Sequence, residues 1–195
     1  AQSAVVFASI NSRARWAALI TLRDAPLASL HSLAADLGVG LGRDWPMEGK
    51  VRGALGFSEA AGAQGELKFE KASIEAPELG PVRFESADLV VKGREFTLRP
   101  ATVTLKGGQS LTVEGTINAE TGARDVSLQT GSLGLSEFQP AWKTLLGGGV
   151  SPVLDRCHLG TWSGALRYRQ KEGEAAPGWT GDFEVASTEC RVEGL

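Results

Sequence analysis

The chain has 195 residues, which is enough to bury a hydrophobic core as one large all-β domain or as two smaller units. Apolar residues at 42% and charged residues at 22% exclude a disordered chain. The net charge of −3, with both signs interspersed, leaves no basic stripe that would neutralise phosphates, so we expect no nucleic-acid partner.

The beginning of the chain predicts two strands followed by a helix. Apolar residues alternate over residues 3–10 and 14–22, which is typical of half-buried strands. From Asp24 the spacing becomes helical, and we expect a helix at about 25–37 with Asp24 as its cap and Pro26 in its first turn. The apolar stripe of this helix consists of Leu27, Leu30, Leu33, Ala34 and Leu37.

Residues 49–130 predict a β-meander. Apolar residues recur at every second position, and Lys-Gly, Gly-Gly or Thr-Gly pairs interrupt them, as expected for antiparallel strands joined by tight turns. One face of the predicted sheet is therefore apolar. Twelve residues, called the face residues below, represent it: Phe84, Leu89, Val91, Phe96, Leu98, Val103, Leu105, Leu111, Val113, Ile117, Val126 and Leu128.

A second helix and two further strands follow the meander. Ser136 and Gln139 have the spacing of a capping box, and we expect a helix at about 137–146. Alternating apolar residues then predict strands at 158–170 and 178–187.

The order of these elements suggests an internal repeat. The Gly-Ala-Leu-x-aromatic element at 53–57 returns 111 positions later, at 164–168, and each copy follows a capped helix. We therefore expect residues 1–130 to form a first repeat unit and 131–195 to form the start of a second, truncated unit. This organisation would make the chain a piece of a longer protein; chance similarity of two strands is the alternative.

The residues that carry chemistry are sparse. The chain has two histidines, His31 and His158, and no nucleophile elbow, metal-ligand spacing or phosphate-binding loop. Paired carboxylates such as Glu66 with Glu70 lie on predicted amphipathic strands, where such residues usually face solvent. We expect a protein without catalytic activity, cofactor or metal site.

The two cysteines, Cys157 and Cys190, both lie beside predicted strands. A disulfide between them would place the chain in an oxidising compartment such as the periplasm. A pair of free thiols in a reducing compartment is the alternative, and the sequence supports both equally.

Three stretches share a pattern of strand, Pro-Leu-containing helix, G-x-L-x-aromatic strand and glycine-punctuated meander. They are ITLRDAPLASLHSLAADLG with VRGALGF, then IEAPELGPVRFESADLVVKGREFTLRPATVTLKGGQSLTVEGTI, and finally SLGLSEFQPAWKTLLGG with WSGALRYR. In these motifs the chain resembles the AsmA-like family of bacterial envelope proteins, which is related to the TamB-type and bridge-like lipid-transfer proteins.

The resemblance implies a mainly β fold: an elongated, curved antiparallel sheet that forms an open groove or half-barrel, with two short amphipathic helices against it. It implies that the apolar face holds phospholipid acyl chains, so that the twelve face residues are candidate lipid contacts. It also implies a periplasmic segment, monomeric as a fragment, of a parent protein anchored in the inner membrane. That parent would serve lipid transport and outer-membrane biogenesis, with other envelope proteins as further partners.

Two other interpretations remain open from the residues alone. A closed β-sandwich or other structural β module could bind a partner protein through its edge strands. A carbohydrate-binding sandwich could use Trp162 and Trp179 to stack on sugars.

Overall fold

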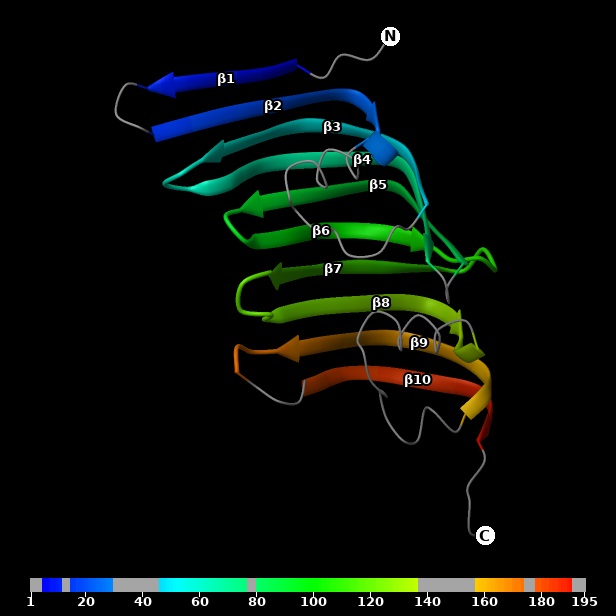
Figure 1. Cartoon of the computed structure of the whole chain (residues 1–195). Helices are drawn as coiled ribbons and strands as arrows, with labels where there is room; N and C mark the ends of the chain where they lie inside the picture. Colours follow the sequence, from blue (N-terminus) through cyan, green and yellow to red (C-terminus); the bar gives the residue numbers. More distant parts are fainter. Residues whose placement is uncertain are drawn as a thin grey trace.

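The computed structural model describes residues 5–11, 15–29, 46–76, 80–136, 157–173 and 178–190. Ten strands form one antiparallel sheet, and strands that follow one another in the chain lie side by side (Figure 1). The strands are β1 Val5–Asn11, β2 Arg15–Pro26, β3 Met47–Ser58, β4 Gly62–Ala76, β5 Gly80–Lys92, β6 Glu95–Thr104, β7 Ser110–Asn118, β8 Arg124–Gly134, β9 Cys157–Gln170 and β10 Gly178–Cys190.

Short turns produce this meander. Gly93, with φ 63°, occupies the two-residue connection between β5 and β6, a position that favours glycine. After β7 the Asn118 side-chain oxygen accepts hydrogen bonds from the N–H groups of Glu120 (2.9 Å) and Thr121 (3.0 Å). Each strand therefore returns directly beside its predecessor.

The expected open antiparallel sheet is confirmed, and the closed sandwich is wrong. The ten strands belong to a single sheet, β1 and β10 form its opposite edges, and no pairing joins them among the described residues. A sandwich needs a second sheet against the apolar face, and the described strands supply none.

The first predicted helix begins later than expected. β2 continues through a bulge between Leu22 and Ala25, and helical residues start only at Leu27. Asp24 does not cap the helix, because it lies in the bulge with φ 51° and pairs with Arg52 at 3.6 Å. The remainder of the helix predicted at 25–37, from residue 30 on, lies outside the described residues.

The second predicted helix, at 137–146, lies entirely outside the described residues. Leu135 and Ser136 are already helical, so helical structure starts before the expected boundary. The predicted boundary between repeat units at residue 130 does not interrupt the sheet, since β8 crosses it and pairs with β9.

Pairs of consecutive exposed residues interrupt the alternation in β5, β6 and β8 and bend these strands. In β5, Glu85 and Ser86 are both exposed. Up to Phe84 the residues on the apolar face have even numbers, and from Ala87 on they have odd numbers. Similar pairs of exposed residues occur at 99–100 in β6 and 131–132 in β8, where the register shifts by one residue. Such bulges increase twist and curvature, and the strands are visibly curved in Figure 1.

Two clusters of buried side chains cover the same face. The smaller cluster lies on β2 to β4 and contains the completely buried Val51. The larger one extends from β6 to β9 and contains Leu133 and Trp162, which are 0% and 1% exposed. Burial therefore concentrates at two places along one sheet.

Candidate functional site

The strand register brings the face residues together. Val91 lies opposite Phe96, which lies opposite Ile117, and Phe84, Val103 and Leu111 form another row of partners. Directly paired residues of antiparallel strands share a face. By this pairing, eleven of the twelve lie on one face of β5 to β8, and Leu105, just after β6, joins the larger cluster on that face.

Exposure separates face residues that support the fold from those that a ligand can reach. Five are buried: Val91, Val103, Leu105, Leu111 and Leu128. Six are half-buried: Phe84, Leu89, Phe96, Leu98, Val113 and Val126. Ile117 is 44% exposed.

Three face residues form what we call the β6–β7 patch: Phe96, Leu98 and Ile117. Phe96 and Leu98 are half-buried and Ile117 is exposed. None of the three belongs to either buried cluster. Gly115 lies opposite Leu98, and a Cβ there would come within 2.5 Å of the Asp125 carbonyl oxygen, so this position stays without a side chain. The patch is thus apolar and partly accessible, and no side chain lies opposite Leu98 at position 115.

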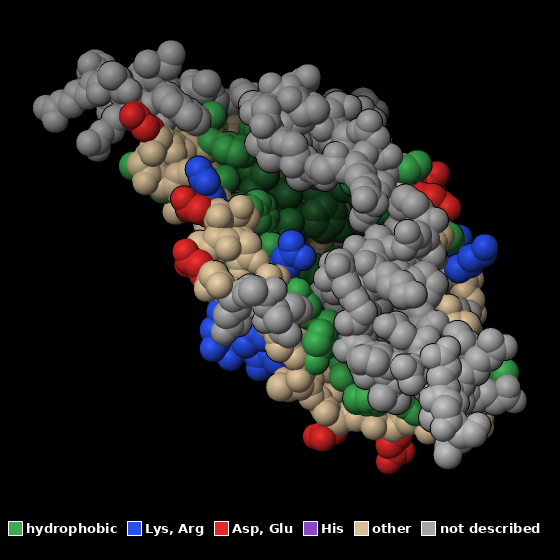
Figure 2. Space-filling model, turned by 60° about the horizontal axis from the view of Figure 1, so that its bottom comes forward, with side chains coloured by type: hydrophobic (Ala, Val, Ile, Leu, Met, Phe, Trp, Pro, Cys, Tyr) green, Lys and Arg blue, Asp and Glu red, His purple; other side chains and the backbone are tan. Residues whose placement is uncertain are grey.

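The space-filling view supports a concave apolar surface. Figure 2 shows hydrophobic side chains gathered in a hollow along the visible face, with Lys, Arg, Asp and Glu side chains at its borders. Contiguous apolar surface of this kind marks a binding site more often than chance exposure does.

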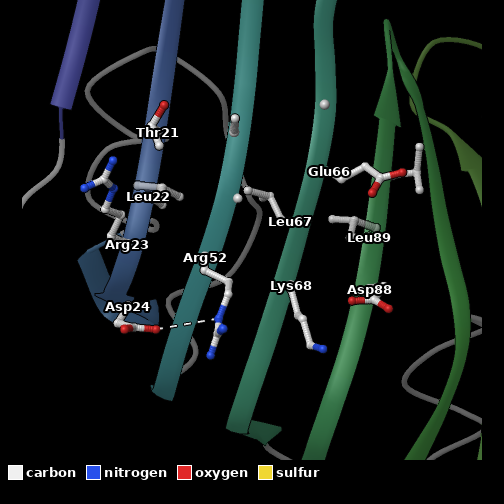
Figure 3. A pocket seen from close by; sticks show the side chains of 14 residues that line it. Thr21, Leu22, Arg23, Asp24, Arg52, Glu66, Leu67, Lys68, Asp88 and Leu89 are labelled. Atoms are coloured by element: carbon white, nitrogen blue, oxygen red, sulfur yellow. Dashed lines mark ion pairs between the residues drawn. The ribbon is translucent and has the colours of Figure 1, made fainter.

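A hollow of about 880 Å³ lies over β2 to β5. Figure 3 shows two rows of side chains beside it: Leu22, Leu67 and Leu89, and next to them Arg52, Lys68 and Asp88. The hollow surrounds two glycines that are diagonal neighbours, because Gly53 pairs with Leu67 and Gly65 pairs with Leu55. Sequence reasoning missed this site, although glycine inside a strand is a signal of close backbone approach.

Both glycines are required by the backbone. Gly53 has φ 138°, and a Cβ built there would lie 2.1 Å from the Glu66 carbonyl oxygen. Gly65 has φ 153°, and its Cβ would lie 2.0 Å from the Ala54 carbonyl oxygen. Only glycine adopts such conformations readily, so these two positions of the hollow stay without side chains.

The opposite face of the sheet carries ion pairs. Arg99 contacts Glu66 at 2.6 Å, and Arg52 pairs with Glu70 as well as with Asp24. On β8 and β9 the Arg167 guanidinium donates two hydrogen bonds to Asp125, at 2.6 and 2.7 Å. Charged residues thus face solvent on one side while apolar residues collect on the other.

These hydrogen bonds from Arg167 lower the pKa of Asp125, because they favour the ionised carboxylate. Partial burial opposes this effect, and Arg169 at 3.4 Å adds to the lowering. The pKa of Arg167 is raised by the same contact. The pair joins the neighbouring strands β8 and β9.

The two cysteines are brought together by the backbone. Cys157 of β9 and Cys190 of β10 are direct partners in the register. Opposed residues of antiparallel strands have Cα atoms about 4.5–5.5 Å apart, and disulfides span about 4.4–6.8 Å. The register therefore satisfies the backbone condition for the disulfide.

Trp162 does not offer a sugar-binding platform. Trp162 is 1% exposed and lies in the larger cluster. Trp179 packs edge-on against Tyr168, with ring centroids 4.7 Å apart. A sugar ring needs an exposed aromatic face, which Trp162 lacks, and the sandwich on which this interpretation rested is not the fold.

The described ranges contain no group of three or more His, Cys, Asp or Glu side chains that could hold a metal ion. No helix in the same ranges has the length and apolar character that a membrane span requires. Protein-family models, curated proteins and solved structures give no match to the chain.

Proposed function

We propose that the chain is a non-enzymatic periplasmic segment of an AsmA-like envelope protein that binds or conducts phospholipid acyl chains along the apolar face of its sheet. The observation that carries the proposal is a single open sheet whose paired strands place apolar residues on one face and ion pairs on the other. An apolar face that the described strands do not cover with a second layer needs a ligand or another protein element against it.

The dimensions of the face suit an acyl chain. Ten strands at about 4.8 Å spacing extend on the order of 40 Å along the sheet. Half of a bilayer's hydrocarbon core is about 15 Å thick, so the face is longer than the depth that one acyl chain occupies in a bilayer. The β6–β7 patch is where we place the first contact, since its side chains are accessible and lie outside both buried clusters.

Lipid extraction of the purified chain followed by mass spectrometry tests the proposal, together with uptake of a fluorescent phospholipid. Ile117→Glu puts a charge into the accessible patch and should reduce uptake at least fivefold, because a carboxylate is strongly disfavoured beside acyl chains. Thr112→Glu on β7 is the matched control, since alternate parity places Thr112 on the other face.

Phospholipid binding by the unaltered chain that Ile117→Glu reduces and Thr112→Glu leaves unchanged would support the proposal. A chain that purifies without lipid and takes up no fluorescent phospholipid would overturn it. Equal losses in both variants would show that the charge acts through the fold rather than through the patch.

A further inference from the structure

Arg124 lies on the apolar face of the sheet. It is the first residue of β8, and the register pairs it directly with Ile117 of β7 and with Gln170 of β9. Because directly paired residues share a face, Arg124 lies on the same face as Ile117 of the β6–β7 patch. Strand alternation places every other charged residue in the described registers of β3 to β8 on the opposite face. Arg124 is therefore the one charged side chain that these registers place beside the apolar residues.

No carboxylate in the described ranges neutralises Arg124. The neighbouring Arg167 and Arg169 both pair with Asp125, which alternation places on the opposite face. The Arg124 side chain is exposed, and it makes no ion pair or hydrogen bond with another described residue. Since a guanidinium stays protonated in proteins, the apolar face carries a full positive charge at this position.

Gln170 brings hydrogen-bond donors to the same place. Tyr168, two residues earlier on β9, is 3% exposed, and its hydroxyl donates to Oε1 of Gln170 at 3.1 Å. This bond uses the amide oxygen, so the Nε2 group keeps its two N–H donors. Within the described ranges these donors have no acceptor. A guanidinium and an oriented amide nitrogen thus belong to directly paired residues, beside the exposed Ile117.

These side chains suit an anion that is attached to acyl chains. A planar guanidinium binds two phosphate oxygens at once, and the amide of Gln170 can donate to a further acceptor of the same group. The methylene groups of an arginine side chain cover apolar surface while its charged end reaches toward water. Arg124 therefore joins the polar and the apolar part of one amphipathic site.

We propose that Arg124 and Gln170 bind the phosphodiester of a glycerophospholipid whose acyl chain lies on the β6–β7 patch. This inference rests on the proposed function, and it names the part of the lipid that the polar end of the site recognises. A phosphodiester has two non-bridging oxygens and two ester oxygens, enough acceptors for the guanidinium and the amide together. A neutral lipid has no anion to offer.

The register gives the path of the acyl chain. Arg124, Ile117 and Phe96 form one row across β8, β7 and β6. Neighbouring strands lie about 4.8 Å apart, so Ile117 is about 5 Å and Phe96 about 10 Å along this row from Arg124. An acyl chain attached to a phosphate at Arg124 would meet the exposed Ile117 first and the half-buried Phe96 next.

Binding of two fluorescent lipids to the whole chain tests the proposal: phosphatidylglycerol, and diacylglycerol with the same labelled acyl chain. The unaltered chain should bind phosphatidylglycerol about tenfold more tightly. Arg124→Gln should abolish this preference, because it weakens phosphatidylglycerol binding about tenfold and leaves diacylglycerol binding unchanged. Gln170→Glu keeps an acceptor for the Tyr168 hydroxyl and removes the donors, so it should also weaken binding of phosphatidylglycerol alone.

Arg83→Gln is the matched control. Arg83 is exposed like Arg124, and its pairing with Ser73 places it on the opposite face of the sheet. The variant removes the same charge, so it should leave both affinities unchanged. Circular dichroism verifies that each variant folds.

The outcomes separate this site from acyl-chain binding as such. Equal affinities of the unaltered chain for the two lipids, or equal losses in Arg124→Gln and Arg83→Gln, would overturn the phosphate site while acyl-chain binding stands. A fatty acid with the same labelled chain that binds as tightly as phosphatidylglycerol would also overturn it, since a carboxylate would then suffice. Absence of binding by either lipid would overturn the site together with the proposed function.

Discussion

Gly53 and Gly65 show how single residues shape the site. Neither contributes a side chain, and each has a positive φ at which a Cβ would lie near 2 Å from a carbonyl oxygen of the neighbouring strand. Both positions line the hollow beside Leu22, Leu67 and Leu89. The missing side chains are therefore as important to the surface as the apolar ones.

Replacement of Gly53 by Ala should destabilise the chain by about 3 kcal/mol, because the φ of 138° is strained for any other residue and the new methyl group meets the Glu66 carbonyl oxygen. Gly56→Ala, on the same strand, is the control: its nearest atom is 3.7 Å away. Chemical denaturation measures both. Equal stabilities of the two variants would contradict the assigned role of Gly53.

The Asp125–Arg167 pair gives the chain a defined response to acid. The pKa of Asp125 is lowered in the folded state by the hydrogen bonds from Arg167, so the folded chain holds the ionised form more strongly than the unfolded chain does. The resulting stabilisation is complete above the unfolded-state pKa of about 3.9. It is lost as the pH falls through the lower pKa of the folded state.

Thermal unfolding midpoints across pH should therefore separate the unaltered chain from Asp125→Asn at neutral pH and converge in acid. The loss of the charged pair lowers the midpoint of the variant only where Asp125 would be ionised. Arg167→Gln should show the same convergence, and the double variant should add little, because both changes break one pair. A separation that persists unchanged through the acid range would refute this role for Asp125.

At the scale of elements, local patterns predicted the strands well because alternation and turn glycines act over a few residues. The strands from 49 to 130 and the pairs of residues that share a face follow directly from that alternation. The change of parity in β5 was not predicted, although its signal was present: Val82 and Phe84 have even numbers, Leu89 and Val91 odd ones. The adjacent polar residues Glu85 and Ser86 accommodate the change.

The position of Asp24 in the bulge of β2 and the hollow around Gly53 and Gly65 could not be predicted from local patterns. An aspartate before a helical apolar stripe is a good cap signal, but tertiary pairing with Arg52 and the bulge in β2 decide where Asp24 lies. The diagonal arrangement of Gly53 and Gly65 depends on the register between β3 and β4, which a single sequence does not reveal. Long-range register is thus the information that the sequence patterns lacked.

The β9–β10 pair has a prediction of its own. We expect Cys157 and Cys190 to form a disulfide under oxidising conditions, because they are direct partners across the two strands. Closing the intervening loop should stabilise the chain by about 3.5 kcal/mol. Thiol titration detects the bond, and thermal unfolding with and without reductant measures its effect.

The variant with Cys157→Ser and Cys190→Ser separates the bond from other effects of the reductant. Its unfolding midpoint should match that of the reduced unaltered chain and should not respond to reductant. Two titratable thiols in the oxidised, unfolded protein would show that the bond does not form. In that case the argument for an oxidising compartment from these cysteines would be lost.

At the scale of the molecule, one sheet joins two buried clusters. The strand order is linear, so β1 has no contact in the sheet with β10 and each strand depends on its neighbours. The clusters around Val51 and Leu133 share the same face but occupy different parts of it. The β6–β7 patch, which lies on this face and belongs to neither cluster, is where the proposed ligand would bind.

Whether the sheet unfolds as one unit or as two repeat units is testable with one core variant in each cluster. We expect Val51→Ala and Leu133→Ala to cost about 2 and about 3 kcal/mol, since both side chains are completely buried. Because β8 crosses the boundary predicted at residue 130 and pairs on both sides, each variant should shift a single unfolding transition. Calorimetry that resolves two transitions, with Val51→Ala lowering one and Leu133→Ala the other, would show instead that the halves unfold independently.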